Sequence, residues 1–310
     1  MSLTPFPHGV SSFGMPVLGG GSEMTTGDIF FVHNGTGSAG YEGTDPAHPL
    51  NSIDNAINKC TASKGDIIYV MPGHAETISG AGGITCDVAG VSIIGLGSGN
   101  LRPTLTWSAT ASSILITAAN VKLKNLITTI SEDEVVSMFA CSAAGCTIDG
   151  VDFKEYGAKG ATGQAIQFLL TTAAADDLTM MNCRHMQMTA ATADQVWIQL
   201  VGNTNARILN NSIHMTAKAA TASICINGST ATVESEVVGN RIVWYGATIT
   251  SPISFITTST GIIAQNLIAM SGAAVLSTVI VGDAMHVFEN YITDTPATSG
   301  LLAPAVDAVT

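Results

Sequence analysis

The chain has 310 residues, and its formal net charge of −12 arises from 11 Lys and Arg residues against 23 Asp and Glu. So few basic side chains argue against nucleic-acid binding, which needs clustered Lys and Arg. Hydrophobic residues make up 46% of the chain, but polar residues interrupt them throughout, so no run of about 20 apolar residues could span a membrane.

The chain opens with a Pro-, Gly- and Ser-rich segment, residues 1–22, without apolar periodicity. Such a segment does not fold on itself. Its scattered apolar side chains are the candidate interface residues of an extended arm: Phe6, Phe13, Met15, Val17 and Leu18. We expect the arm to lie on a neighbouring subunit, with an arm folded back on its own chain as the alternative. No cationic segment followed by an apolar run opens the chain, so no signal peptide is expected.

Residues 23–90 are expected to form an N-terminal cap with a short helix and the first strands. Ser52 can serve as the helix N-cap. Four apolar residues fall on one face of this helix: Leu50, Ile53, Ile57 and Cys60. Alternation of apolar residues over 67–71 then predicts a strand. A helix placed here covers the unpaired end of a stack of β-coils.

Residues 91–295 repeat one short apolar pattern around an Asn or Gly. Seven anchors recur 24 to 32 residues apart: Asn125, Gly150, Asn182, Asn211, Asn240, Asn266 and Asn290. Two positions before each anchor the side chain is apolar: Leu123, Ile148, Met180, Leu209, Val238, Ala264 and Phe288. Two positions after, Ile recurs at 127, 213, 242, 268 and 292. Self-similarity at this period is typical of a repeat architecture, in which one unit cannot bury its apolar face alone.

The repeats alternate with period two, which indicates strands rather than helices. A second apolar run precedes most anchors, so each period reads as strand, bend and strand. We therefore predict an all-β fold, a right-handed parallel β-helix of about eight coils, with residues 296–310 as a C-terminal tail. An antiparallel sandwich, whose strands also alternate, is the alternative.

The recurrent Asn has a physical role in such coils. A sharp bend between strands needs a left-handed residue, which Asn and Gly tolerate best. Asn side chains stacked on successive coils can also hydrogen-bond as a ladder. The predicted structural ladder is Asn125, Asn182, Asn211, Asn240, Asn266 and Asn290.

Charged residues are only 11% of the chain, and none lies between Arg241 and Asp283. Weakly polar surfaces of this size usually mark interfaces, so we expect partner molecules to cover part of the exterior. That the stacked Ser, Thr and Ala coils are simply neutral remains the alternative. Six cysteines without a CxxC pair are expected to be buried reduced thiols: Cys60, Cys86, Cys141, Cys146, Cys183 and Cys225.

The first 80 residues carry a family resemblance. The order FFV-x-NGTG, then DPxxPLxSIDxAI, then GDIIYVMPGxxxE resembles the opening of pectin-lyase-like right-handed β-helix proteins. More narrowly, these motifs and the arm text LTPFPHGVSSFGMPVLGG resemble β-helical virion proteins of tailed bacteriophages. The resemblance implies a structural protein of the particle, either a head decoration or cement protein or a tail fibre or spike part, often trimeric.

From this we expect a non-enzymatic virion protein made in the host cytoplasm. The leading hypothesis is a capsid decoration or cement protein, a homotrimer that binds the major capsid protein or other virion proteins through its arm and low-charge faces. No cofactor, nucleic acid or membrane partner is expected. The alternative is a tail fibre or tailspike component that binds or cleaves host surface polysaccharide. A free polysaccharide enzyme is a third reading, which should carry a secretion signal.

Some β-helix relatives are polysaccharide lyases or hydrolases, so we also sought catalytic groups. Glycoside hydrolysis needs two carboxylates about 5–9.5 Å apart. Asp149, Asp152 and Glu155 are the best candidates, on one coil. Asp152 and Arg184 occupy equivalent positions on successive coils, which predicts a structural ion pair instead.

Three further groups of residues could form sites. His185 and His214 each follow an anchor by three residues and could meet a ligand together. The run from Glu132 to Glu134 is expected to be a solvated loop. Exposed aromatic platforms for a glycan could come only from Trp107, Trp197 and Trp244 among the tryptophans. We therefore predict no catalytic, cofactor or metal residues.

Overall fold

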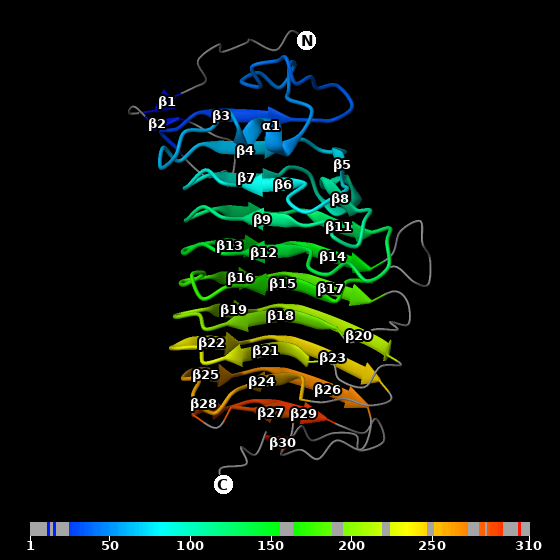
Figure 1. Ribbon diagram of the computed structural model, residues 1–310, viewed down its shortest axis with the longest axis vertical. Helices are drawn as coiled ribbons and strands as arrows, with labels where there is room; N and C mark the ends of the chain where they lie inside the picture. The colour runs from blue at the N-terminus through cyan, green and yellow to red at the C-terminus, as the bar shows by residue number, and fades with distance from the viewer. Residues whose placement is uncertain are drawn as a thin grey trace.

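The computed structural model describes residues 11–12, 15–16, 25–155, 164–187, 195–218, 224–246, 251–271, 279–282, 284–293 and 303–304. The chain winds into a parallel β-helix in which successive coils stack along the long axis (Figure 1). Each coil contributes one strand to each of three sheets. The coil-to-coil pairings are parallel and in register, which excludes the antiparallel sandwich.

We call the three sheets sheet 1, sheet 2 and sheet 3; they have ten, ten and eight strands, respectively. The strands of sheet 1 are β3 (Ile29–Val32), β4 (Ile67–Val70), β7 (Ser92–Gly95), β10 (Lys122–Lys124), β13 (Thr147–Asp149), β16 (Thr179–Met181), β19 (Arg207–Leu209), β22 (Ser235–Val238), β25 (Gly261–Ala264) and β28 (Met285–Phe288). Those of sheet 2 are β5 (Ala75–Ile78), β8 (Thr104–Trp107), β11 (Ile127–Ile130), β14 (Asp152–Glu155), β17 (Arg184–Gln187), β20 (Ser212–Lys218), β23 (Arg241–Gly246), β26 (Leu267–Ser271), β29 (Tyr291–Thr293) and the antiparallel β30 (Ala303–Pro304). Those of sheet 3 are β6 (Ile84–Cys86), β9 (Ile114–Ile116), β12 (Phe139–Cys141), β15 (Gln167–Thr171), β18 (Val196–Val201), β21 (Ile224–Thr230), β24 (Ile253–Phe255) and β27 (Ile280–Val281).

Three short elements complete the described structure. β1 (Ser11–Ser12) and β2 (Met15–Pro16) form an antiparallel pair. A 3₁₀ turn, η1 (Gly99–Leu101), lies between β7 and β8. The first complete coil, β4 to β6, lies within the segment 23–90 that the sequence assigns to the cap and first strands. Among the described residues, no helix has the length and apolarity needed to cross a membrane.

The predicted cap helix is confirmed. Helix α1 (Ile53–Ile57) begins after Ser52, whose hydroxyl accepts a hydrogen bond from the Asn55 amide at 3.2 Å. Its buried face consists of Ile53, Ala56 and Ile57. In Figure 1 the helix lies at the end of the stack where β3 and β4 begin. It thus supplies apolar cover where the coil interior would otherwise meet water, and each Ile contributes about 1.5–3 kcal/mol by burial.

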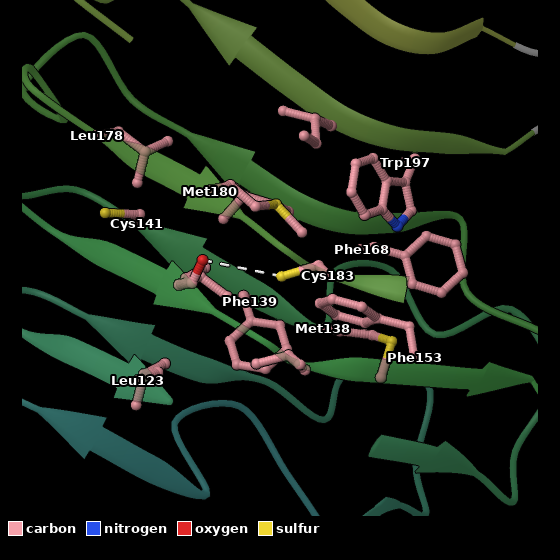
Figure 2. Packing of buried hydrophobic residues seen from close by; sticks show 14 of the residues in the cluster. Leu123, Met138, Phe139, Cys141, Phe153, Phe168, Leu178, Met180, Cys183 and Trp197 are labelled. Carbon is pink, nitrogen blue, oxygen red and sulfur yellow. Dashed lines mark hydrogen bonds between the residues drawn. The ribbon is translucent and has the colours of Figure 1, made fainter. Parts of the chain in front are cut away.

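Alternate side chains of each strand fill the interior, as the period of two predicts. Aromatic rings occupy it in the middle coils, where Phe153 packs edge-to-face against Phe168 and Trp197 at centroid distances of 5.7 and 6.1 Å. Figure 2 shows these rings together with Phe139 and Met138 inside the coils. Trp107 and Trp197 are fully buried, so neither forms a surface platform. The side chain of Trp244 lies outside the described residues.

The six cysteines are free thiols, five of them buried and Cys60 partly exposed. Burial raises the pKa of Cys183 to about 12. That of Cys60 is also raised to about 12, by burial and then by the charges of Asp66 and Asp28. Thiols held protonated in this way behave as small apolar side chains.

The corner between sheets 1 and 2 corrects the predicted anchor column. The left-handed residue is the predicted anchor at Asn125, Gly150 and Asn182, with φ of 57°, 65° and 55°. In the following coils it is the residue before the anchor: Asn210, Gly239, Gln265 and Glu289. The anchors therefore belong to two adjacent columns rather than one. A one-residue offset moves a side chain to the opposite face.

The second column holds the ladder. Asn211, Asn240, Asn266 and Asn290 are at most 1% exposed. Each of the last three accepts, through its Oδ1, hydrogen bonds from the backbone amide and the Nδ2 of the Asn one coil earlier, at 2.8–3.0 Å. The Nδ2 groups also donate to backbone carbonyls of sheet 1, so the amides satisfy one another and the bend. The ladder therefore has four of the six predicted members.

The other two predicted members point to different partners. The Asn125 Nδ2 donates to the carbonyls of Gly95 and Gly97 at 2.7 and 3.2 Å. The Asn182 Nδ2 donates to Asp149 Oδ1 at 2.9 Å. In these two coils and in the coil of Gly150 the ladder position is taken by Leu126, Val151 and Cys183, which make the equivalent backbone hydrogen bonds.

The same offset divides the recurrent Ile residues. Ile213, Ile242, Ile268 and Ile292 pair in one inward row of sheet 2. Ile127 instead pairs with Asp152, in the outward row. The Ile repeat that the sequence shows as one column is thus two columns on opposite faces.

Candidate functional site

The strongest cluster of charges lies on the outer side of the corner between sheets 1 and 2; we call Arg102, Lys124, Asp149, Asp152 and Arg184 the charged corner. Asp152 on β14 pairs in register with Arg184 on β17. The Arg184 Nε and Nη2 donate to the two carboxylate oxygens at 3.1 and 2.6 Å. This is the ion pair that the sequence predicts, in a two-bond geometry that favours an Arg.

A second guanidinium reaches the same carboxylate. The Arg102 Nη2 donates to Asp152 Oδ2 at 2.9 Å, and its Nη1 donates to the Gly150 carbonyl at 3.3 Å. Asp152 is only 3% exposed. Burial by itself raises the pKa of Asp152, but the Arg184 hydrogen bonds and the charges of Arg184 and Arg102 outweigh it and hold that pKa below its ordinary value. A carboxylate held as an anion by two cations is poorly suited to proton transfer.

Asp149 is engaged next to it. The Lys124 ammonium lies 3.2 Å from Asp149 Oδ2, and Asn182 occupies the other oxygen. Both carboxylates of this corner therefore join neighbouring coils. Of the three best catalytic candidates that the sequence marks on this coil, Asp149 and Asp152 are therefore engaged in structural contacts. Glu155 is the third.

Glu155 lies inside the β-helix. It is 1% exposed, and its Oε2 lies 3.6 Å from the Nε2 of the fully buried His185. The Gln195 Nε2 donates to Glu155 Oε1 and, at 3.0 Å, to the Ala165 carbonyl. The His185 ring also packs edge-on against Phe168 at 4.6 Å. A carboxylate and an imidazole enclosed in this way cannot reach a polymeric substrate.

The structure separates the two histidines that the sequence groups together. His185 pairs with Ile213 in the inward row, whereas His214 pairs with Met186 in the outward row. They therefore point to opposite sides of sheet 2 and share no site. The cause is the one-residue offset at the corner between Asn182 and Asn211, which the count from the anchors does not reveal.

The family motifs of the N-terminal segment form a structural network. The Asn34 amide donates to His74 Nδ1 at 3.0 Å, and the Asn34 Oδ1 accepts from the Ala75 amide at 2.9 Å. The His74 Nε2 then donates to Glu76 Oε2 at 2.9 Å, and the same oxygen accepts from the Ile53 amide at 3.1 Å. These hydrogen bonds join the NGTG loop and helix α1 to the first coil, and they are buried, since His74 is 1% exposed. Sequence reasoning assigns these residues no role beyond the resemblance.

A shallow hollow in the loop of residues 40–48 was not anticipated from the sequence. Tyr41 packs edge-on against His48 at 5.3 Å, and the His48 Nδ1 lies 3.4 Å from Asp45 Oδ2. The Ala47 amide, and then the His48 side chain, lower the pKa of Asp45. These groups are exposed and partnered within the loop.

Large exposed apolar side chains gather at the corner of sheets 1 and 2 in the last coils; we call Leu267, Phe288 and Tyr291 the apolar corner. They are 45%, 48% and 42% exposed. Leu267 and Tyr291 are partners in register, and Phe288 lies three residues before Tyr291, across Asn290 and the left-handed Glu289. The sequence places Phe288 as a position of the apolar repeat but not at the surface.

The arm residues Phe6, Phe13, Val17 and Leu18 lie outside the described residues. Met15 belongs to β2, where its backbone pairs with Ser12, and its side chain is not described. The loop from Glu132 to Glu134 lies at the surface, with Glu134 exposed. Among the described residues, no group of three or more His, Cys, Asp or Glu is placed to hold a metal ion.

No protein-family model and no curated protein matches the chain. Solved structures with a similar trace include a rhamnogalacturonan lyase, at 10% identity and a TM-score of 0.44, which covers 85% of this chain and 87% of that one. A GH136 lacto-N-biosidase from Eubacterium ramulus gives 9% and 0.40, covering 86% and 68%. ORF18 of Geobacillus virus E2 gives 12% and 0.24, covering 82% and 59%. Likenesses this distant carry no argument about activity, which has to come from the residues.

Proposed function

We propose that this chain is a non-enzymatic structural protein of a tailed-phage virion, and more specifically a capsid decoration or cement protein that binds the major capsid protein. The motifs of its first 80 residues, which resemble those of phage β-helix proteins, support the assignment to a virion. The observation that carries the structural role is the state of the candidate catalytic groups. Asp152 is neutralised by two guanidinium groups, and Glu155 and His185 are enclosed in the core.

The body is suited to a mechanical role. Continuous parallel pairing in three sheets, the four-residue Asn ladder and the helix α1 at one end give a rod without a hinge among the described coils. A cement protein acts by burying area against several shell subunits, so it needs a rigid body and an apolar contact surface. The apolar corner supplies such a surface, and the arm supplies further apolar side chains.

The test is co-sedimentation of the purified chain with heads of the phage that encodes it, prepared without this protein. We expect the full chain to sediment with the heads. Deletion of residues 1–22 should lower its affinity at least about tenfold, because the arm's apolar contacts are lost. The triple variant Leu267→Ser, Phe288→Ser, Tyr291→Ser should have a similar effect.

The matched control is Leu101→Ser with Met186→Ser, which removes two exposed apolar side chains of 64% and 40% exposure from the earlier coils. It should bind as the unaltered protein does. Normal binding by the arm deletion would refute the role given to the arm. Failure of the full chain to bind heads would refute the decoration role itself.

One observation favours a second candidate, a tail fibre or tailspike component that binds host surface polysaccharide. Phe288 and Tyr291 expose two aromatic rings at one corner, and the faces of such rings stack on sugars and other ring-shaped groups. In that case the purified chain should bind polysaccharide from the host envelope, and Tyr291→Ala should abolish the binding. Release of sugar fragments by the unaltered chain would show cleavage and would contradict the non-enzymatic assignment.

A further inference from the structure

The outer side of sheet 3, which we call the neutral face, carries no ionisable side chain in its strands. None of the 11 basic and 23 acidic residues, and no His, falls within any of the eight strands of sheet 3. The outward row in register consists of Thr85, Leu115, Ala140, Leu170, Gln199, Asn227, Ser254 and Val281. The neutral face therefore carries only apolar, hydroxyl and amide side chains from one end of the stack to the other.

The outer sides of the other two sheets differ. Sheet 1 carries Lys122, Lys124 and Arg207 within its strands, and sheet 2 carries Lys154, Arg184 and Arg241. The carboxylates Asp149, Asp152 and Glu236 lie among them. Charges are thus distributed over two of the three sides, which makes the third side unlike the rest of the surface.

The neutral face is in contact with solvent. Leu115, Leu170, Val196, Ile224 and Val281 are all partly exposed. Its margins carry more fully exposed apolar side chains: Val136, ahead of β12, is 53% exposed, and Ile256, after β24, is 40% exposed. Apolar groups left in water at a continuous flat surface gain free energy when a partner covers them.

The side-chain amides of the neutral face, those of Gln199 and Asn227, already form hydrogen bonds with other protein groups. The Asn227 Nδ2 donates to Gln199 Oε1 at 3.0 Å, and the Gln199 Nε2 donates to the Leu200 carbonyl at 3.5 Å. Amides that already bond within the face lose few water contacts when it is covered. The desolvation cost of covering these two residues is therefore small.

The dimensions suit a protein interface. At about 4.8 Å per step, eight strands extend about 34 Å, and their mean length of four residues is about 13 Å. The strands alone thus cover roughly 450 Å², over half of the roughly 800 Å² per partner of a standard interface, and the apolar margins add to this area. An extended sheet surface suits another protein surface better than a small ligand.

The net charge of the chain indicates which partner covers the neutral face. With a net charge of −12, two copies of this chain repel each other, and they can approach closely only where neither carries like charges at the contact. We propose that the neutral face is the surface through which copies of this chain pack against one another. This inference does not depend on the virion role, because it rests on the charge and exposure of sheet 3 alone.

The test compares two leucines that are both outward and partly exposed, Leu170 on sheet 3 and Leu209 on sheet 1. Sedimentation equilibrium of the full chain at micromolar concentration should give a mass of more than one copy. Leu170→Glu should reduce it to the mass of one copy, because the change places a carboxylate against an apolar partner surface. Leu209→Glu should leave the mass unchanged.

Circular dichroism and thermal unfolding establish whether each variant is folded. If Leu170→Glu does not fold, Ser254→Glu, a half-buried polar position on the same face, decides the question and should also give single copies. The proposal is overturned if the unaltered chain is a single copy, or if the folded sheet 3 variants keep its mass. Dissociation by Leu209→Glu alone would assign the contact to sheet 1 and would equally overturn it.

Discussion

The corner between sheets 1 and 2 differs between the coils from β10 to β17 and those from β19 to β29. In the earlier coils the inside of the corner is apolar, with Leu126, Val151 and Cys183, and the outside carries the charged corner. In the later coils the inside is a ladder of Asn amides, and the outside of the last of these coils carries the apolar corner. The backbone is the same in both, so the sequence is free to place its polar groups on either side.

The difference indicates what each half does. Where ions and hydrogen bonds lie outside, neighbouring coils are tied together at the surface and the exterior is strongly hydrated. Where the amides lie inside, the bend is satisfied internally, and the exterior can carry exposed Leu, Phe and Tyr without loss of coil-to-coil contacts. We infer that the later coils are built to present a docking surface.

The largest expected effect comes from the ladder. Asn240→Gly removes the acceptor of two Asn211 groups and the donor to the Ile208 carbonyl. Because these partners are buried, the free energy of unfolding should fall by about 3–5 kcal/mol, measured by urea denaturation. The same change at Asn182, a left-handed position whose Nδ2 bond to Asp149 is partly exposed, should cost less than about 1 kcal/mol. Equal losses would show that the two columns are not distinct.

The next effect tests the apolar part of the same column. Val151→Asn places an amide among apolar neighbours and should lower the free energy of unfolding by about 2–4 kcal/mol. Cys183→Asn should cost no more than about 1 kcal/mol, because it lies next to Asn211, whose Oδ1 already accepts from the Cys183 amide. Denaturant midpoints compare the two. A larger loss at position 183 than at 151 would contradict the extension of the ladder.

A smaller effect is expected at the charged corner. Arg184→Met removes two hydrogen bonds from Asp152 but leaves the one from Arg102, so it should cost about 1–2 kcal/mol at neutral pH. The pKa of Asp152 is lower in the folded protein than in the unfolded one. Its contribution is therefore present above the unfolded pKa of about 3.9 and is lost as the pH falls through the folded pKa.

The difference in stability between the Arg184→Met variant and the unaltered protein should accordingly be full at pH 7 and should shrink as Asp152 becomes protonated. Thermal unfolding between neutral pH and the acid limit of folding measures it. A difference that is constant over this range would show that Arg184 stabilises the fold by packing rather than by its charge.

The smallest effect belongs to an ion pair of the later coils, on the outer side of sheet 1. Arg207 and Glu236 lie 3.6 Å apart with side chains 47% and 37% exposed. Arg207→Met should therefore change the free energy of unfolding by less than about 1 kcal/mol, and less still in high salt. A loss as large as that of Arg184→Met would mean that surface ion pairs stabilise both halves alike.

The sequence predicts the repeats, the order of strand, bend and strand in each period and helix α1, because each depends on local periodicity or on a cap. It also predicts the pair of Asp152 and Arg184, since both lie on the same side of the offset. It does not reveal the offset itself, because Asn serves in both columns. At Asn210 and Asn211 the two roles stand side by side, and Gly239 before Asn240 is the signal that separates them.

The buried group of Glu155, His185 and Gln195 could not be predicted for a different reason. Glu155 and His185 are neighbours only through the coil-to-coil register, and Gln195 reaches them from the next sheet. The side of the sheet to which each points depends on that register. Periodicity alone therefore leaves Glu155 among the catalytic candidates, whereas the fold buries its carboxylate.

The most direct test of the structural role is an image of virions in which this chain carries a small added label. Electron cryomicroscopy should place the label in regular positions on the head shell, at the joints between capsid subunits. Density at the tail tip, or none on the particle, would contradict the decoration role. Loss of the head density in virions that carry the triple change at Leu267, Phe288 and Tyr291 would identify the apolar corner as the attachment surface.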